Sequence, residues 1–177
     1  LSRYLSAMSS RPVLLQSAIP MPAGEPWAGS LPRALALACL LALSLLPVAT
    51  VEIPAMVDYP NHLARMSILA RAGTDAAHPL YVVSWAFYPN LAMDLLVPPL
   101  ARWIGVEAAT RLFYLVSQLL ILGGAMILSL AVRGRAFGAG LTACLFLYAT
   151  PFAFGFVNFE FALGLSLFAL AAWIRLA

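Results

Sequence analysis

Charge is scarce in this chain, and lysine is absent altogether. Only 10% of the 177 residues are charged and 63% are hydrophobic, against roughly 25% charged and 45–50% apolar residues in an ordinary soluble domain. All ten basic residues are arginines, and they are scattered without the clustered stripe that binding to a nucleic-acid backbone requires. The composition therefore argues against a soluble domain and a nucleic-acid partner, and it indicates a membrane protein.

Familiar site motifs are missing as well. The sequence holds no zinc-ligand spacing, P-loop, dinucleotide fingerprint or nucleophile elbow. The two cysteines, Cys39 and Cys144, lie inside apolar runs, where cysteine usually serves as a small buried hydrophobe. Neither a disulfide nor a metal pair is predicted from them, and the cofactor stays unknown.

Four apolar runs are long enough to cross a bilayer, which takes about 20 residues of helix. They cover residues 34–51, 109–132, 137–156 and 159–176. Because backbone polar groups must be satisfied internally in hydrocarbon, each run is predicted to be helical. We expect an all-α fold, a polytopic transmembrane helical bundle over residues 31–177 that follows a flexible cytoplasmic tail, residues 1–30. The first residue is not Met and the last run ends with the chain, so we expect a fragment of a longer protein.

A fifth segment, residues 90–104, decides the topology. It is short, and it contains Asp94, Pro98-Pro99 and Arg102; a charge at mid-bilayer costs at least about 2.5–3.5 kcal/mol. We therefore expect it to lie along the membrane interface, as a second interfacial helix after one at about residues 60–72. The two helices would belong to a long extracytoplasmic first loop, residues 52–108.

The arginines support this topology. If residues 90–104 do not cross, one side of the membrane receives Arg3, Arg11, Arg33, Arg133, Arg135 and Arg175. Basic residues are enriched in cytoplasmic segments, so the N-terminus is expected in the cytoplasm. The first loop holds three arginines but also five of the seven acidic residues, and its net acidity favours the exterior.

Several short elements in this layout resemble the GT-C superfamily of polytopic membrane glycosyltransferases. They are Val57-Asp58-Tyr59-Pro60-Asn61-His62, Val97-Pro98-Pro99-Leu100, Gly105-Val106-Glu107-Ala108-Ala109-Thr110-Arg111 and Arg133-Gly134-Arg135. The resemblance covers roughly residues 34–155. It implies that Asp58 serves in catalysis and that the donor is a sugar on a polyprenyl phosphate, in a bacterial inner (plasma) membrane. Asp58-Tyr59-Pro60 departs from the paired-acid patterns of that family, so the sequence does not support a divalent metal.

The residue chemistry agrees with a transfer reaction. An acceptor hydroxyl loses a proton as it attacks, and the carboxylate of Asp58 could take it. The leaving phosphate needs cationic or donor groups. The candidate substrate-binding residues are Asn61, His62, Arg65, Asp94 and Arg102.

Structural roles remain open for the same residues. Asp58 and Asn61 are also favoured helix N-caps, His62 and Arg65 fit the solvated face of an amphipathic helix, and Asp94 could pair with an arginine and serve folding alone. The protein as a whole could be a non-enzymatic polytopic protein, a transporter or an assembly subunit. Few polar side chains lie in the clear spans, whereas secondary transporters bind substrates near mid-bilayer, which weighs mildly against transport.

Overall fold

The structure, a computed structural model, describes residues 31–51 and 53–176; the predicted tail, residues 1–30, lies outside them. Seven helices and no strand occur in these ranges. The helices are α2 (Leu31–Thr50), α3 (Tyr59–Arg71), α4 (Ala92–Ile104), α5 (Val106–Arg133), α6 (Phe137–Phe146), α7 (Thr150–Phe154) and α8 (Val157–Leu176). The all-α prediction is confirmed for the described residues.

Four segments are long and apolar enough to cross a membrane: Leu31–Thr50, Val106–Arg133, Phe137–Phe154 and Val157–Leu176. They coincide with the four predicted spans, and the protein is an integral membrane protein. The starts of three spans differ from the predictions. Helix α2 begins at Leu31, three residues early. Helix α5 begins at Val106, three residues early, because Gly105 turns the chain at φ 84°. Helix α8 begins at Val157, two residues early, after the turn at Gly155 with φ 83°.

The third span was predicted to be helical over residues 137–156. An apolar segment of membrane-spanning length is confirmed there, Phe137–Phe154, but its helix is interrupted. The segment divides into α6 and α7, with a turn at residues 147–149 between them. Pro151 lies in the first turn of α7, where its missing N–H is harmless, whereas inside a continuous helix it would remove a hydrogen bond. The hydroxyl of Tyr148, in this turn, donates to the carbonyl of Ser44 in α2.

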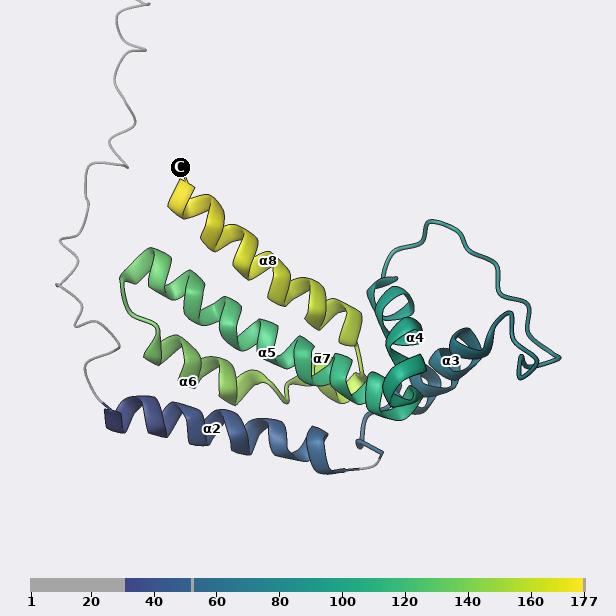
Figure 1. Cartoon of the computed structure of the whole chain (residues 1–177). Coiled ribbons are helices and arrows are strands. Elements are labelled where there is room, and N and C mark those ends of the chain that lie inside the picture. The colour runs from purple at the N-terminus through teal and green to yellow at the C-terminus, as the bar shows by residue number, and fades with distance from the viewer. Residues whose placement is uncertain (1–30, 52, 177) are drawn as a thin grey trace, which may run out of the picture.

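Helices α3 and α4 confirm the two short helices predicted in the first loop. Each has 13 residues and is therefore about 20 Å long, well short of the roughly 30 Å of a bilayer core. Both gather at one end of the bundle (Figure 1). Their orientation along a lipid surface stays a prediction.

Helices α5 and α8 form the central pair of the bundle and run in the same direction (Figure 1). Glycines permit their close approach. A Cβ added at Gly164 would lie 2.5 Å from Leu120 Cβ, and one added at Gly124 would lie 2.9 Å from the carbonyl oxygen of Gly164. The contact is the close packing between small residues that is common in membrane bundles.

The charges divide between the two ends of the bundle. We call one the arginine end; it carries Arg33, Arg133, Arg135 and Arg175 at the termini of the long helices. We call the other the acidic end; it carries α3, α4 and the acidic residues Asp58, Asp75, Asp94, Glu107 and Glu160. These five are all the acidic residues among those described.

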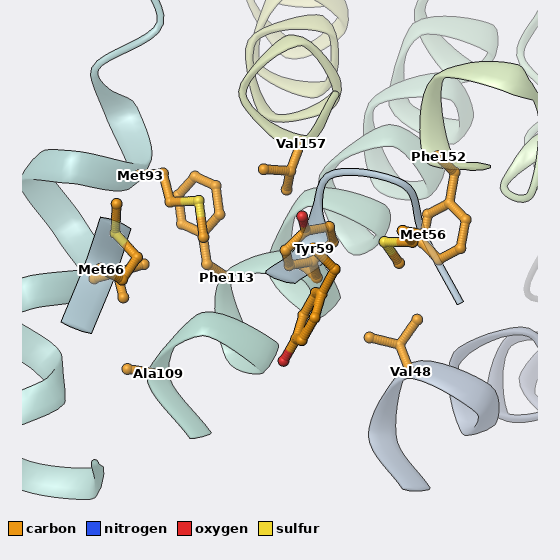
Figure 2. Close-up of a cluster of buried hydrophobic side chains, with 11 residues drawn as sticks. Val48, Met56, Tyr59, Met66, Met93, Ala109, Phe113, Phe152 and Val157 are labelled. Atoms are coloured by element: carbon orange, nitrogen blue, oxygen red, sulfur yellow. The ribbon is translucent and has the colours of Figure 1, made fainter. Parts of the chain in front are cut away.

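A buried hydrophobic cluster holds the acidic end together. It contains Val48 at the end of α2, Tyr59 and Met66 of α3, Met93 of α4 and Phe113 of α5, among others. Figure 2 shows these side chains meeting with Phe152 and Val157. Burial of large side chains contributes about 1.5–3 kcal/mol each, so the cluster fixes the first loop to the turn before α8.

Candidate functional site

A cavity of about 780 Å³ opens at the acidic end; we call it the acidic-end cavity. Its walls come from α3, the segment before α4, the start of α4 and the turn between α7 and α8. Five of the six predicted site residues line it: Asp58, Asn61, His62, Arg65 and Asp94. Residues 36 positions apart in the sequence thus face one hollow.

Asp58 occupies the N-cap position of α3, but its side chain makes no capping hydrogen bond. The backbone holds it instead, because its N–H donates to the carbonyl of Phe154 at 3.2 Å. One carboxylate oxygen, Oδ1, accepts a hydrogen bond of 3.2 Å from Nδ2 of Asn61. The carboxylate is half-buried and lines the cavity, so it retains acceptor capacity for a ligand.

Gly155 supports Asp58 and His62 from the turn before α8. A Cβ added to Gly155 would lie 3.1 Å from Cβ of Asp58, so only glycine fits both the positive φ and this contact. Its carbonyl oxygen lies 3.1 Å from Nε2 of His62. A carbonyl can only accept, so Nε2 donates and Nδ1 is left for another partner.

Arg65 and Asp94 form a two-pronged ion pair between α3 and α4. Nε of Arg65 donates to Oδ1 of Asp94 at 2.6 Å, and its Nη2 donates to Oδ2 at 3.0 Å. The side chain of Asp94 is 4% exposed, whereas that of Arg65 is 60% exposed. Asp94 therefore orients Arg65, and the guanidinium keeps N–H groups for a second acceptor.

Arg102 is the predicted site residue that does not join the others. It lies in the last turn of α4, is exposed, and is not among the residues that line the acidic-end cavity. Ten residues separate it from the start of α4, so it lies near the opposite end of that helix from Asp94.

Asn158 belongs to the cavity wall although it was not among the predicted site residues. Its Oδ1 accepts a hydrogen bond of 2.9 Å from the backbone N–H of Met93, which satisfies one of the open N–H groups at the start of α4. The predicted topology could have indicated that Asn158 lies near this site. A turn between the third and fourth spans must return to the side of the first loop, and Asn158 follows that turn.

Buried polar groups adjoin the site. Tyr59 and Tyr114 are fully buried, with ring centroids 5.4 Å apart, and neither hydroxyl has a hydrogen-bond partner. Burial raises the pKa of Tyr59, and the guanidinium of Arg111 partly offsets this. Glu160 is 4% exposed with one unpartnered oxygen, because the first turn of α8 packs against α5.

The described residues do not gather a cluster of metal ligands. Among residues 31–51 and 53–176, no three His, Cys, Asp or Glu side chains come together in a way that could hold a metal ion. In the cavity, the carboxylate of Asp94 is occupied by Arg65.

Comparison of the chain with protein-family models, with curated proteins and with solved structures finds no match.

Proposed function

We propose that the acidic-end cavity is the sugar-transfer site of a GT-C-like membrane glycosyltransferase. The donor would be a sugar on a polyprenyl phosphate, and the acceptor would approach from outside the cytoplasm. One observation carries the proposal. The carboxylate of Asp58, which does not cap α3, lines a cavity of about 780 Å³ together with an arginine and a histidine. A carboxylate can deprotonate an acceptor hydroxyl, and the two other side chains can stabilise a phosphate.

In the proposed reaction, an acceptor hydroxyl attacks the anomeric carbon of the donor sugar. A new glycosidic C–O bond forms, and the bond between the anomeric carbon and the phosphate oxygen breaks. Its electron pair leaves with the polyprenyl phosphate. The hydroxyl proton passes to Asp58, whose remaining acceptor capacity faces the cavity.

Arg65 would bind the leaving phosphate through the N–H groups that Asp94 does not occupy. Asp94 would be a positioning residue, because both of its oxygens are engaged by Arg65. His62 would present Nδ1 to the substrate while Nε2 holds the carbonyl of Gly155. Asn61, which donates to Asp58, would orient the base. Arg102 has no part in this assignment.

The decisive test is Asp58→Asn in membranes that contain the whole protein. The amide has the shape of the carboxylate but cannot take the proton, so release of polyprenyl phosphate from radiolabelled polyprenyl-phosphate sugars should fall by about 10²–10⁴-fold. Asp75→Asn is the matched control, because Asp75 is exposed and lies outside the cavity lining. Transfer that survives Asp58→Asn unchanged would remove the proposed base.

A non-enzymatic role remains the second candidate, and specific contacts favour it. The Arg65–Asp94 pair and the bond from Met93 to Asn158 join α3, α4 and α8, as they would in a transporter or assembly subunit whose polar loop only anchors helices. On this reading, Asp94→Asn would lower the unfolding temperature, and no polyprenyl-phosphate sugar would be consumed by the unaltered protein.

A further inference from the structure

A second cavity, of about 790 Å³, lies at the arginine end; we call it the arginine-end cavity. It is bordered by the start of α2, the last turns of α5 and the first turn of α6. Three arginines line it: Arg33, Arg133 and Arg135. No acidic residue is among the described residues of its lining, so its field favours an anion.

The local backbone fixes two of these arginines on either side of a tight turn. Gly134 ends α5 in the left-handed conformation with φ 66°, and its N–H donates to the carbonyl of Leu130 at 3.1 Å. The hydroxyl of Ser129 donates to the carbonyl of Arg135 at 2.7 Å. Arg133 and Arg135 are thereby held at one rim of the cavity, and both are exposed.

The start of α6 adds further donors. This ten-residue helix begins without a side-chain cap, and its residues Phe137, Gly138 and Ala139 line the cavity. The first N–H groups of an α-helix have no partner inside the helix, and the dipole places partial positive charge there. Together with arginines, such a terminus suits a phosphate group.

The remaining wall is apolar. Ala125, Leu128, Val132, Ala143 and Leu167 line the cavity along the sides of α5, α6 and α8. These residues lie in segments apolar enough to cross a membrane, so this wall runs from the polar rim toward the bilayer core. The occupant it fits has an anionic head and a hydrocarbon tail.

We propose that the arginine-end cavity binds the phosphate headgroup of an anionic phospholipid from the adjacent leaflet. The guanidinium groups of Arg133 and Arg135 hold the phosphate in forked hydrogen bonds, and an acyl chain lies along the apolar wall. Basic pockets between transmembrane helices recognise anionic lipids in this way. The site is separate from the acidic-end cavity and does not depend on the function proposed for it.

The test uses the purified whole protein in phosphatidylcholine nanodiscs with a minor share of phosphatidylglycerol. Lipid retained through detergent extraction is quantified by mass spectrometry as the ratio of phosphatidylglycerol to phosphatidylcholine. Each basic residue near an anionic surface contributes about 1 kcal/mol, so the double variant Arg133→Gln, Arg135→Gln should lower the ratio about thirtyfold.

Two further variants separate a site from general attraction. Arg175→Gln removes an arginine that lies at the same end but outside the cavity lining, and it should leave the ratio unchanged. Gly138→Phe keeps every arginine and fills the cavity, because a Cβ at Gly138 meets nothing within 4 Å; it should lower the ratio several-fold. Thermal unfolding of each variant confirms that it is folded.

The outcomes divide cleanly. The site is supported if the ratio of phosphatidylglycerol to phosphatidylcholine falls in the double variant and in Gly138→Phe but stays unchanged in Arg175→Gln. Equal loss in Arg175→Gln means diffuse surface attraction and overturns it, as does a ratio near that of the bulk lipid in the unaltered protein. Displacement of the lipid by millimolar inorganic phosphate overturns the lipid as the source of the anion.

Discussion

The two ends of the bundle carry cavities of nearly equal size and opposite chemistry. The arginine-end cavity, about 790 Å³, is lined by three arginines without a described acidic residue, whereas the acidic-end cavity, about 780 Å³, is lined by two carboxylates, an arginine and a histidine. Among the described residues, four arginines and no acidic residue lie at one end, against four arginines and five acidic residues at the other. The two cavities therefore differ in the charges that line them and not in their volume.

The two ends also differ in how acidic residues accompany their arginines. At the acidic end, five described acidic residues accompany four arginines, and Asp94 accepts two hydrogen bonds from Arg65. No described acidic residue lies at the arginine end. Because an excess of positive charge is typical of the cytoplasmic side, the predicted topology has the arginine end in the cytoplasm and the acidic end outside.

The largest expected effect tests this polarity directly. In a background with Cys39→Ala and Cys144→Ala, a cysteine at Thr74 should react fully with a membrane-impermeant thiol reagent in intact cells, and a cysteine at Gly134 should react only after permeabilisation. Both positions are exposed; Thr74 follows α3 at the acidic end, and Gly134 follows α5 at the arginine end. The reverse labelling pattern would invert the assignment of the two ends.

A second prediction concerns the helix pair that both ends share. Gly164→Val should destabilise the protein by roughly 3 kcal/mol, the upper part of the range for overpacking, because the added Cβ would meet backbone atoms of Leu120 and Ile121 within 3 Å. Ser166→Val is the control, since Ser166 is exposed on the same helix. Unfolding temperatures in detergent give the comparison, and equal shifts would mean that α5 and α8 do not pack as described.

Much of the framework could be predicted because hydrophobic length dictates it. The four spans and the two short helices α3 and α4 follow from apolar runs, Pro60 and the charges of residues 90–104. The break between α6 and α7 was missed, because proline in an apolar run permits either a kinked helix or a new start. The structure has a new start, with a turn at residues 147–149 where Tyr148 donates to the carbonyl of Ser44. These two residues are 104 positions apart, so the contact could not be read from the local sequence.

The acidic-end cavity was predictable only in part, for a related reason. Asp58, Asn61, His62 and Arg65 lie on consecutive turns of one helix, so their grouping follows from local periodicity. Asp94 joins them through a partner 29 residues away, and which arginine it would pair with was not determined by spacing. Arg102, on the same helix as Asp94, remained outside, since eight residues on a helix span about 12 Å along its axis.

A third prediction concerns the unequal burial of the pair at the acidic end. Arg65→Met should destabilise more than Asp94→Leu, because it leaves the 4%-exposed carboxylate without its partner, which costs about 1–3 kcal/mol. Asp94→Leu leaves a guanidinium that is 60% exposed and can be hydrated. Thermal unfolding of both variants, and of the double variant, measures the coupling energy between Arg65 and Asp94. Equal losses of stability in the two single variants would contradict the unequal burial of the two side chains.

The smallest effect compares two glycines with similar backbone conformation at opposite ends. Gly155→Ala and Gly134→Ala both place a side chain at positive φ, 83° and 66°, at a cost of about 1–2 kcal/mol each. Only at Gly155 does the new Cβ lie 3.1 Å from Asp58, whereas at Gly134 it meets nothing within 4 Å. Similar losses of stability are therefore expected, and only Gly155→Ala should also slow the proposed sugar transfer, because it displaces the carboxylate. If both variants slowed transfer equally, the activity would follow stability, and the contact between Gly155 and Asp58 would have no catalytic meaning.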